Sequence, residues 1–141
     1  MASTLKINTL TGVSTAGSIA VTGEGNSTTT NLQQGLAKSW VNFTGTSTVT
    51  VNDSLNNASV TDSGTGQYVP NMTNAMGNAN YSYNYSIQRA ATNDVVFVTQ
   101  RQSVDPTTTT YNTRAFHVDD DTSPVGEDAG VVATSIHGDL A

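Results

Sequence analysis

The acidic side chains are the most numerous groups in this chain that could do chemistry, and five of the eleven fall in one short stretch. Asp119, Asp120 and Asp121 are followed closely by Glu127 and Asp128. Calcium takes about six to eight oxygen ligands, and this run lacks the alternating spacing of a calcium loop. Because serine, proline and glycine lie between the acids, the stretch is typical of a solvated connecting loop. Whether Asp119–Asp121 bind calcium stays open.

No pattern in the sequence supports catalysis. The two histidines, His117 and His137, are too few for a metal triad and lie far apart. No serine stands in a Gly-x-Ser-x-Gly elbow. A glycosidase needs two acids across a cleft, one of them kept protonated by burial, whereas most acids here lie beside turn residues. We therefore expect no enzymatic activity and no cofactor, and we assign no residue as a metal ligand.

Three tyrosines alternate along one segment and form the clearest candidate for a contact surface. Tyr81, Tyr83 and Tyr85 share a period of two with Ile87, which places all four on one face of a strand. Aromatic faces can stack on sugar rings or on another protein, so these tyrosines are a possible contact face. The alternative is core packing or a subunit interface, where alternating aromatic side chains are common.

The charge composition excludes several classes of partner. Only 11% of the residues are charged, and the net charge is −6. The five basic residues form no run, so we expect no binding to nucleic acid. The chain has no cysteine, which excludes disulfides and thiolate chemistry and fits assembly in a reducing cytoplasm.

The sequence gives no sign of export or membrane insertion. Met1–Lys6 lacks a basic segment followed by a long apolar stretch, so no secretion signal is predicted. No apolar run approaches the length needed to cross a bilayer. We therefore expect that the protein is not secreted through this route.

Residues 1–30 are predicted to form an extended N-terminal arm. Leu5 and Ile7 alternate in one segment, and Ile19 and Val21 alternate in a second, with threonine, serine and glycine around them. Two short strands cannot make a core alone. We therefore expect these four residues to serve attachment or oligomerisation by docking on another subunit. The alternative is a hairpin folded back on its own domain.

Residues 31–141 are predicted to form one all-β domain, either a β-sandwich or a jelly-roll-like fold. A helical turn is expected over residues 31–37, where Gly35 limits its length. Turns are expected at residues 52–53 and 62–66, where asparagine, aspartate and glycine gather. The expected strands cover residues 39–44, 48–51, 58–61, 67–69, 81–87, 95–98, 113–118 and 131–136.

Three further expectations concern single residues. Trp40 and Phe43 lie in the most apolar cluster and are expected to anchor the core. Pro70 is expected to end its strand, because proline cannot donate to a ladder. Val95–Val98 is expected to be buried on both faces, because it is continuously apolar.

Six stretches spread along the chain form a set: Leu5–Asn8, Gly23–Gly25, Asn31–Lys38, Trp40–Phe43, Val60–Gly66 and Ser135–Ala141. Together they resemble a family of small β-rich virion surface proteins, of fibre or decoration type, from marine tailed phages. The resemblance covers most of the chain, but residues 82–128 match nothing in that family. It implies an oligomeric virion component, often a trimer, and carries no catalytic motif.

The sequence therefore predicts a structural protein on the virion surface of a tailed bacteriophage, assembled in the host cytoplasm. It would serve as a head fibre, a capsid decoration (cement) protein or a short tail fibre. The alternative is a receptor-binding module for a host surface glycan. Expected partners are copies of itself in a homotrimer and other capsid or tail proteins.

Overall fold

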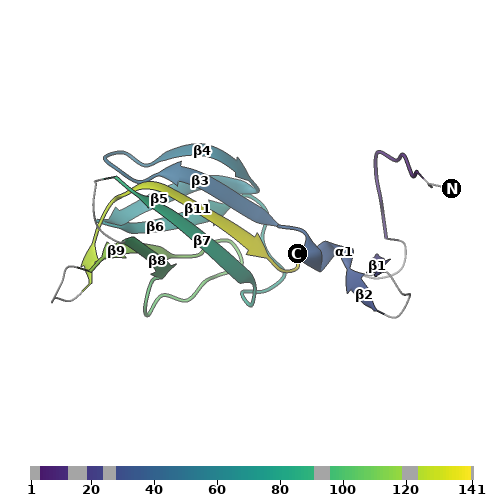
Figure 1. Cartoon of the computed structure of the whole chain (residues 1–141). Helices are drawn as coiled ribbons and strands as arrows, with labels where there is room; N and C mark the ends of the chain where they lie inside the picture. Colours follow the sequence, from purple (N-terminus) through teal and green to yellow (C-terminus); the bar gives the residue numbers. More distant parts are fainter. Residues whose placement is uncertain (1–3, 13–18, 24–27, 91–95, 119–123, 141) are drawn as a thin grey trace. The chain divides into compact units, whose positions relative to one another are not determined.

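Strands dominate the computed structural model of this chain (Figure 1), which describes residues 4–12, 19–23, 28–90, 96–118 and 124–140. The predicted all-β class is confirmed. The chain divides into two compact units, Met1–Leu36 and Ala37–Ala141. The sequence placed the boundary after residue 30, whereas the structure places it after Leu36. Among the described residues, no helix is long and apolar enough to cross a membrane.

Asn31 joins a strand to a helical turn in the N-terminal unit. Strand β1 (Ala20–Thr22) pairs antiparallel with β2 (Thr29–Asn31). The Asn31 side-chain oxygen accepts hydrogen bonds from the backbone nitrogens of Gln33 at 2.8 Å and Gln34 at 3.2 Å. Asparagine is a favoured residue at this capping position. The predicted helical turn is confirmed, because α1 covers Leu32–Gly35.

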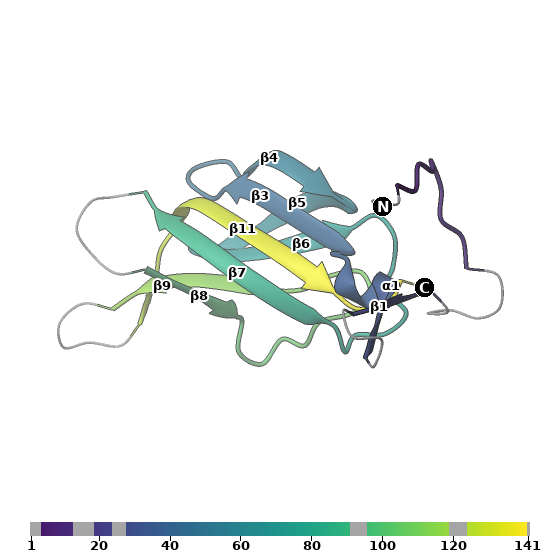
Figure 2. The same ribbon diagram turned by 45° about the vertical axis from the view of Figure 1, so that its right-hand side comes forward.

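The second unit is a sandwich of two antiparallel sheets, which Figures 1 and 2 show lying face to face. The first sheet has the order β4-β3-β11-β7, and its strands are β3 (Ser39–Thr44), β4 (Thr50–Leu55), β7 (Ser82–Arg89) and β11 (Ala129–His137). The second sheet has the order β10-β9-β6-β5, with β8 also paired to β9. Its strands are β5 (Asn57–Gly64), β6 (Gln67–Met72), β8 (Val96–Gln100), β9 (Thr113–His117) and β10 (Val125–Gly126).

Two turns connect β4, β5 and β6, and the sequence predicted one of them. The 62–66 turn is confirmed at Thr65 and Gly66, whereas residues 62–64 belong to β5. Gly66 has a φ of +66°, a conformation that favours glycine. The turn predicted at residues 52–53 is wrong, because β4 continues to Leu55. The chain turns at Asn56 instead, where φ is +51°. Asparagine tolerates this left-handed conformation better than most residues.

Pro70 does not end its strand, so that prediction is wrong. Pro70 lies inside β6 and is opposite Val60 in the ladder with β5. Its carbonyl accepts from the backbone nitrogen of Tyr111 at 3.4 Å, on the side away from β5. A strand residue directs its N–H and C=O to the same side, so the missing N–H does not interrupt the ladder with β5.

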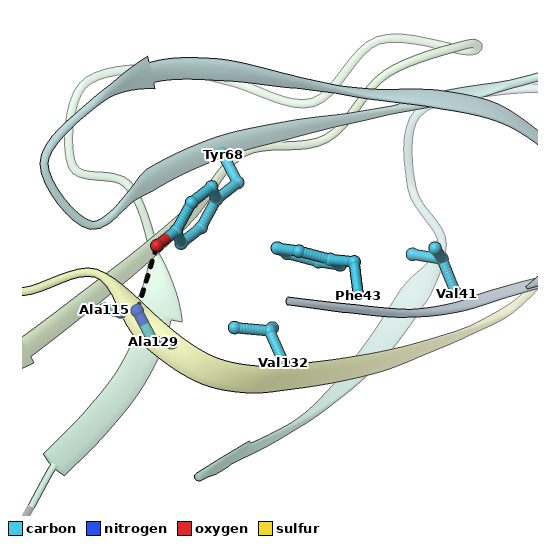
Figure 3. Close-up of a cluster of buried hydrophobic side chains, with 6 residues drawn as sticks. All are labelled: Val41, Phe43, Tyr68, Ala115, Ala129 and Val132. Carbon is cyan, nitrogen blue, oxygen red and sulfur yellow. Dashed lines mark hydrogen bonds between the residues drawn. The ribbon is translucent and has the colours of Figure 1, made fainter. Parts of the chain in front are cut away.

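The interior of the sandwich follows the period of two along β3. Val41 and Phe43 are fully buried, and Figure 3 shows them beside Val132 of β11 and Tyr68 of β6. Ala115 and Ala129 complete this cluster. The backbone nitrogen of Ala129 donates to the Tyr68 hydroxyl at 3.0 Å, so the polar end of the buried ring is satisfied.

Trp40 lies on the opposite face of β3 and is half-buried. The prediction that it anchors the core is therefore wrong, while that for Phe43 is confirmed. A second buried cluster supplies the remaining bulk of the core and consists of Met72, Met76, Tyr81, Tyr111 and Ile136.

Candidate functional site

The four residues predicted to serve attachment all lie in the N-terminal unit. Leu5, Ile7 and Val21 are 79%, 50% and 51% exposed, while Ile19 is half-buried. Leu5 and Ile7 lie in no strand, so the prediction of a strand there is wrong over residues 4–12. A strand needs a partner for its backbone groups. The unit thus exposes apolar side chains on a segment with little core of its own.

The tyrosine face of β7 points into the sandwich. Tyr81 is 7% exposed, and its hydroxyl donates to the carbonyls of Thr107 at 2.8 Å and Thr110 at 3.0 Å. Tyr83 and Tyr85 are half-buried and pack against the same core cluster. The interpretation of these three residues as a contact face is therefore wrong for Tyr81, and all three rings contribute to core packing.

Burial also changes the acid–base behaviour of this cluster. Desolvation raises the pKa of the Tyr111 hydroxyl to about 12, and it raises the pKa values of Tyr81 and Tyr85 well above their ordinary value. The hydroxyls therefore stay protonated at neutral pH. The cluster offers no ionised oxygen for general-base chemistry.

The described part of the acidic stretch is structural. Arg89 Nε donates to Glu127 Oε1 at 2.7 Å, and His117 Nδ1 lies 2.8 Å from Glu127 Oε2. Asp128 accepts from the backbone nitrogen of Gly66 at 2.8 Å. The solvated-loop prediction is wrong for Glu127 and Asp128, which are half-buried and partnered.

Asp119–Asp121 lie outside the described residues, and so does any calcium site that they would form. Over the described ranges, no three side chains of the metal-binding types gather closely enough to hold an ion.

An aromatic pair lies on the outer face of the second sheet. The rings of Phe97 in β8 and Phe116 in β9 stack with their centroids 5.6 Å apart, and Phe97 is 45% exposed. β8 and β9 lie side by side in Figure 2. The predicted burial of Val95–Val98 on both faces is therefore wrong over residues 96–98, because this strand has a solvent face.

A polar pocket of about 260 Å³ adjoins this aromatic pair. Its lining residues are Gln67, Arg101, Gln102, Ser103 and Arg114. Gln67 of β6 and Arg114 of β9 are direct partners in the sheet. The Arg114 guanidinium carbon lies 6.0 Å from the centroid of the Phe116 ring, which links the pocket to the aromatic pair.

The loop after β8 brings Arg101 to the pocket. Gln100 anchors this loop through two hydrogen bonds of its side-chain amide. The nitrogen donates to the Val104 carbonyl at 3.4 Å, and the oxygen accepts from the Tyr83 hydroxyl. Ser103 adopts a φ of +61°, an uncommon conformation for serine. The loop that carries Arg101 is thus tied to the core rather than loosely appended.

The charges of the pocket are unusual for this acidic chain. No carboxylate lines it, although the chain carries a net charge of −6. Arg101 and Arg114 form no ion pair with any carboxylate in the part of the chain that the structure describes. The Arg114 Nε is buried and has no hydrogen-bond acceptor there. An anion in the pocket would meet two guanidinium groups that pair with no carboxylate of the described residues.

Sequence reasoning missed this pocket because its residues are distant along the chain. In the sequence, Arg101 and Arg114 are isolated basic residues that belong to no run. The available signal was their spacing from aromatic residues: Phe97, Thr99 and Arg101 share one alternation, and Arg114 and Phe116 share another. The pairing of β8 with β9 joins the two sets, and no local pattern shows that pairing.

Comparison with known proteins identifies no relative, because the chain matches no protein family model, no curated protein and no solved structure.

Proposed function

We propose that this chain is a non-enzymatic structural protein on the surface of a tailed-phage particle. It serves as a head fibre, a capsid decoration protein or a short tail fibre, and it is assembled in the host cytoplasm. The resemblance of its sequence to virion surface proteins motivates the proposal. The observation that carries it is the exposure of apolar side chains along the N-terminal unit of a chain whose second unit, the β-sandwich, has its own core.

The exposed apolar side chains favour a docking role for the N-terminal unit. Leu5, Ile7 and Val21 are each at least half exposed. Full burial of such a side chain stabilises an association by about 1.5–3 kcal/mol. Among the described residues, no further strand pairs with the two-stranded sheet of β1 and β2, and a neighbouring chain can add a strand to such a sheet. The occupant in this proposal is the sheet of a neighbouring virion subunit, with the chain itself forming a homotrimer.

Reattachment to particles tests the docking role. Particles lacking the protein should bind the purified full-length chain but not a Leu5→Asp/Ile7→Asp variant, because two carboxylates replace the apolar surface. Lys6→Gln is the matched control, since it changes the same stretch without removing apolar area, and it should reattach normally. Reattachment of the double variant at the level of the unmodified chain would disprove the docking role.

The location on the particle has a separate readout. Quantitative mass spectrometry of purified particles gives the copy number relative to the major capsid protein. Many copies in proportion to capsid symmetry indicate a decoration protein, and a few copies indicate a tail fibre. Absence of the protein from purified particles would contradict the whole assignment.

A second candidate function is recognition of a host surface glycan by the sandwich. The exposed Phe97 ring, stacked on Phe116 beside a polar pocket, favours it. Aromatic rings at protein surfaces provide apolar contact area with defined geometry, as sugar rings require. This function is compatible with display on a particle and concerns the sandwich rather than the N-terminal unit.

A further inference from the structure

One pocket of this acidic protein holds two arginines that pair with no carboxylate among the residues that the structure describes. Five basic residues serve the whole chain, and two of them, Arg101 and Arg114, line the same cavity. Like charges in one site repel each other, and no acid of the lining offsets the repulsion. A bound anion would remove this cost. The pocket is therefore arranged for a negatively charged group.

We propose that the Arg101–Arg114 pocket binds an acidic sugar through the oxyanion, a carboxylate or a sulfate ester, that its ring carries. A guanidinium presents paired N–H donors that match the oxygens of such a group. Gln67 and Gln102 add amide groups for hydroxyls at the margin of the pocket. The volume of about 260 Å³ is small and suits one substituted ring rather than a large ligand.

The neighbouring aromatic pair argues for a sugar rather than a free ion. The Arg114 side chain adjoins the aromatic pair. Its guanidinium carbon is 6.0 Å from the Phe116 centroid, and Phe116 stacks on the exposed Phe97. In this proposal the apolar face of the sugar ring lies on the Phe97–Phe116 pair while its oxyanion meets the neighbouring Arg114 guanidinium. An inorganic anion would use only the arginines.

The charge pattern argues against nucleic acid as the occupant. Binding along a phosphate backbone requires a stripe of cations, whereas this face offers two in a single pocket. The net charge of −6 also repels a long polyanion outside the pocket.

The inference rests on the second proposed function, glycan recognition, and adds the chemical class of the glycan. Calorimetric titration of the full-length protein with glucuronic acid, glucose 6-sulfate and glucose tests it. The two acidic sugars distinguish carboxylate from sulfate ester. We expect at least one acidic sugar to bind saturably and glucose to bind far more weakly. Arg101→Gln and Arg114→Gln should each weaken that binding by about tenfold or more.

Matched variants separate the pocket from general charge effects. Lys6→Gln removes the same charge from the N-terminal unit and should leave sugar affinity unchanged. Arg101 lies in a loop rather than inside a strand, so we expect Arg101→Gln to fold normally. This variant therefore still tests the pocket if Arg114→Gln fails to fold. Phe97→Ala should weaken the acidic sugar but not inorganic sulfate.

Four outcomes would overturn the inference, and each contradicts a different part of it. Equal binding of glucose and acidic sugars, unaffected by the arginine variants, would leave glycan recognition standing without the acidic class. Inorganic sulfate binding as tightly as the acidic sugars would show an ion site without a sugar. Tighter binding of a single-stranded DNA oligonucleotide at the arginines would replace the glycan with nucleic acid. Absence of all saturable sugar binding would remove glycan recognition as well.

Discussion

Raising the pH from about 9 to about 12 is expected to unfold the β-sandwich. Burial is the main cause that raises the pKa of Tyr68 and of Tyr111 from the ordinary value of 10.0 to about 12. Burial also raises the pKa values of Tyr81 and Tyr85. The folded chain therefore keeps these protons at a pH where the unfolded chain releases them.

The size of the effect follows from the two fully buried rings. One pKa unit corresponds to about 1.4 kcal/mol, so Tyr68 and Tyr111 together lose about 5 kcal/mol of stabilisation over this range. Their contribution is complete below the unfolded pKa of 10.0 and is lost as the pH rises through the folded pKa of about 12. A domain is stable by only about 5–15 kcal/mol, so the loss is a large share of the total.

Circular dichroism and tyrosinate absorbance, recorded on the same samples, check this expectation. The β-type signal should disappear together with ionisation of the buried tyrosines. Tyr111→Phe provides the control, because it should reduce the slope of unfolding free energy against pH by about 1.4 kcal/mol per pH unit. Full ionisation of all tyrosines near pH 10 with an intact β signal would contradict the burial of these hydroxyls.

Replacing Phe43 by alanine is expected to lower the free energy of unfolding by about 3–5 kcal/mol. The Phe43 ring is fully buried and packs edge-on against Tyr68, with ring centroids 5.1 Å apart. Val41 and Val132 belong to the same buried cluster as Phe43, as Figure 3 shows. The substitution therefore leaves a cavity that these neighbours cannot fill without moving their strands.

Trp40→Ala is the matched control for Phe43→Ala. Trp40 is on the same strand and is larger, but it lies on the opposite face and is half-buried. Its loss should cost only about 1–2 kcal/mol. Denaturant unfolding of the two variants measures both values. An equal or greater loss for Trp40→Ala would show that the faces of β3 are assigned the wrong way round.

Local patterns predicted much of this fold because β-structure has a short period. The alternation Tyr81, Tyr83, Tyr85 identified β7, and the glycines at residues 64 and 66 identified the turn between β5 and β6. These signals depend only on neighbours in the sequence. They establish the all-β class and most strands without any knowledge of the partners.

The remaining features depend on partners that are distant along the chain. Trp40 and Phe43 lie in the same apolar stretch of the sequence. Which of the two side chains faces the second sheet is decided only when β3 pairs with β4 and β11. Pro70 is tolerated because its missing donor faces away from β5. Arg101 and Arg114 meet only after β8 pairs with β9, so the pocket had no local signal.

The oligomeric state of two chains tests the central claim most directly, namely that the N-terminal unit holds neighbouring subunits while the sandwich folds independently. Light scattering at micromolar concentration should give a trimer mass for the full-length chain and a monomer mass for residues 37–141. The shorter chain should keep its β-type circular dichroism and melt cooperatively. A full-length monomer, a trimeric shorter chain or an unfolded shorter chain would each contradict the claim.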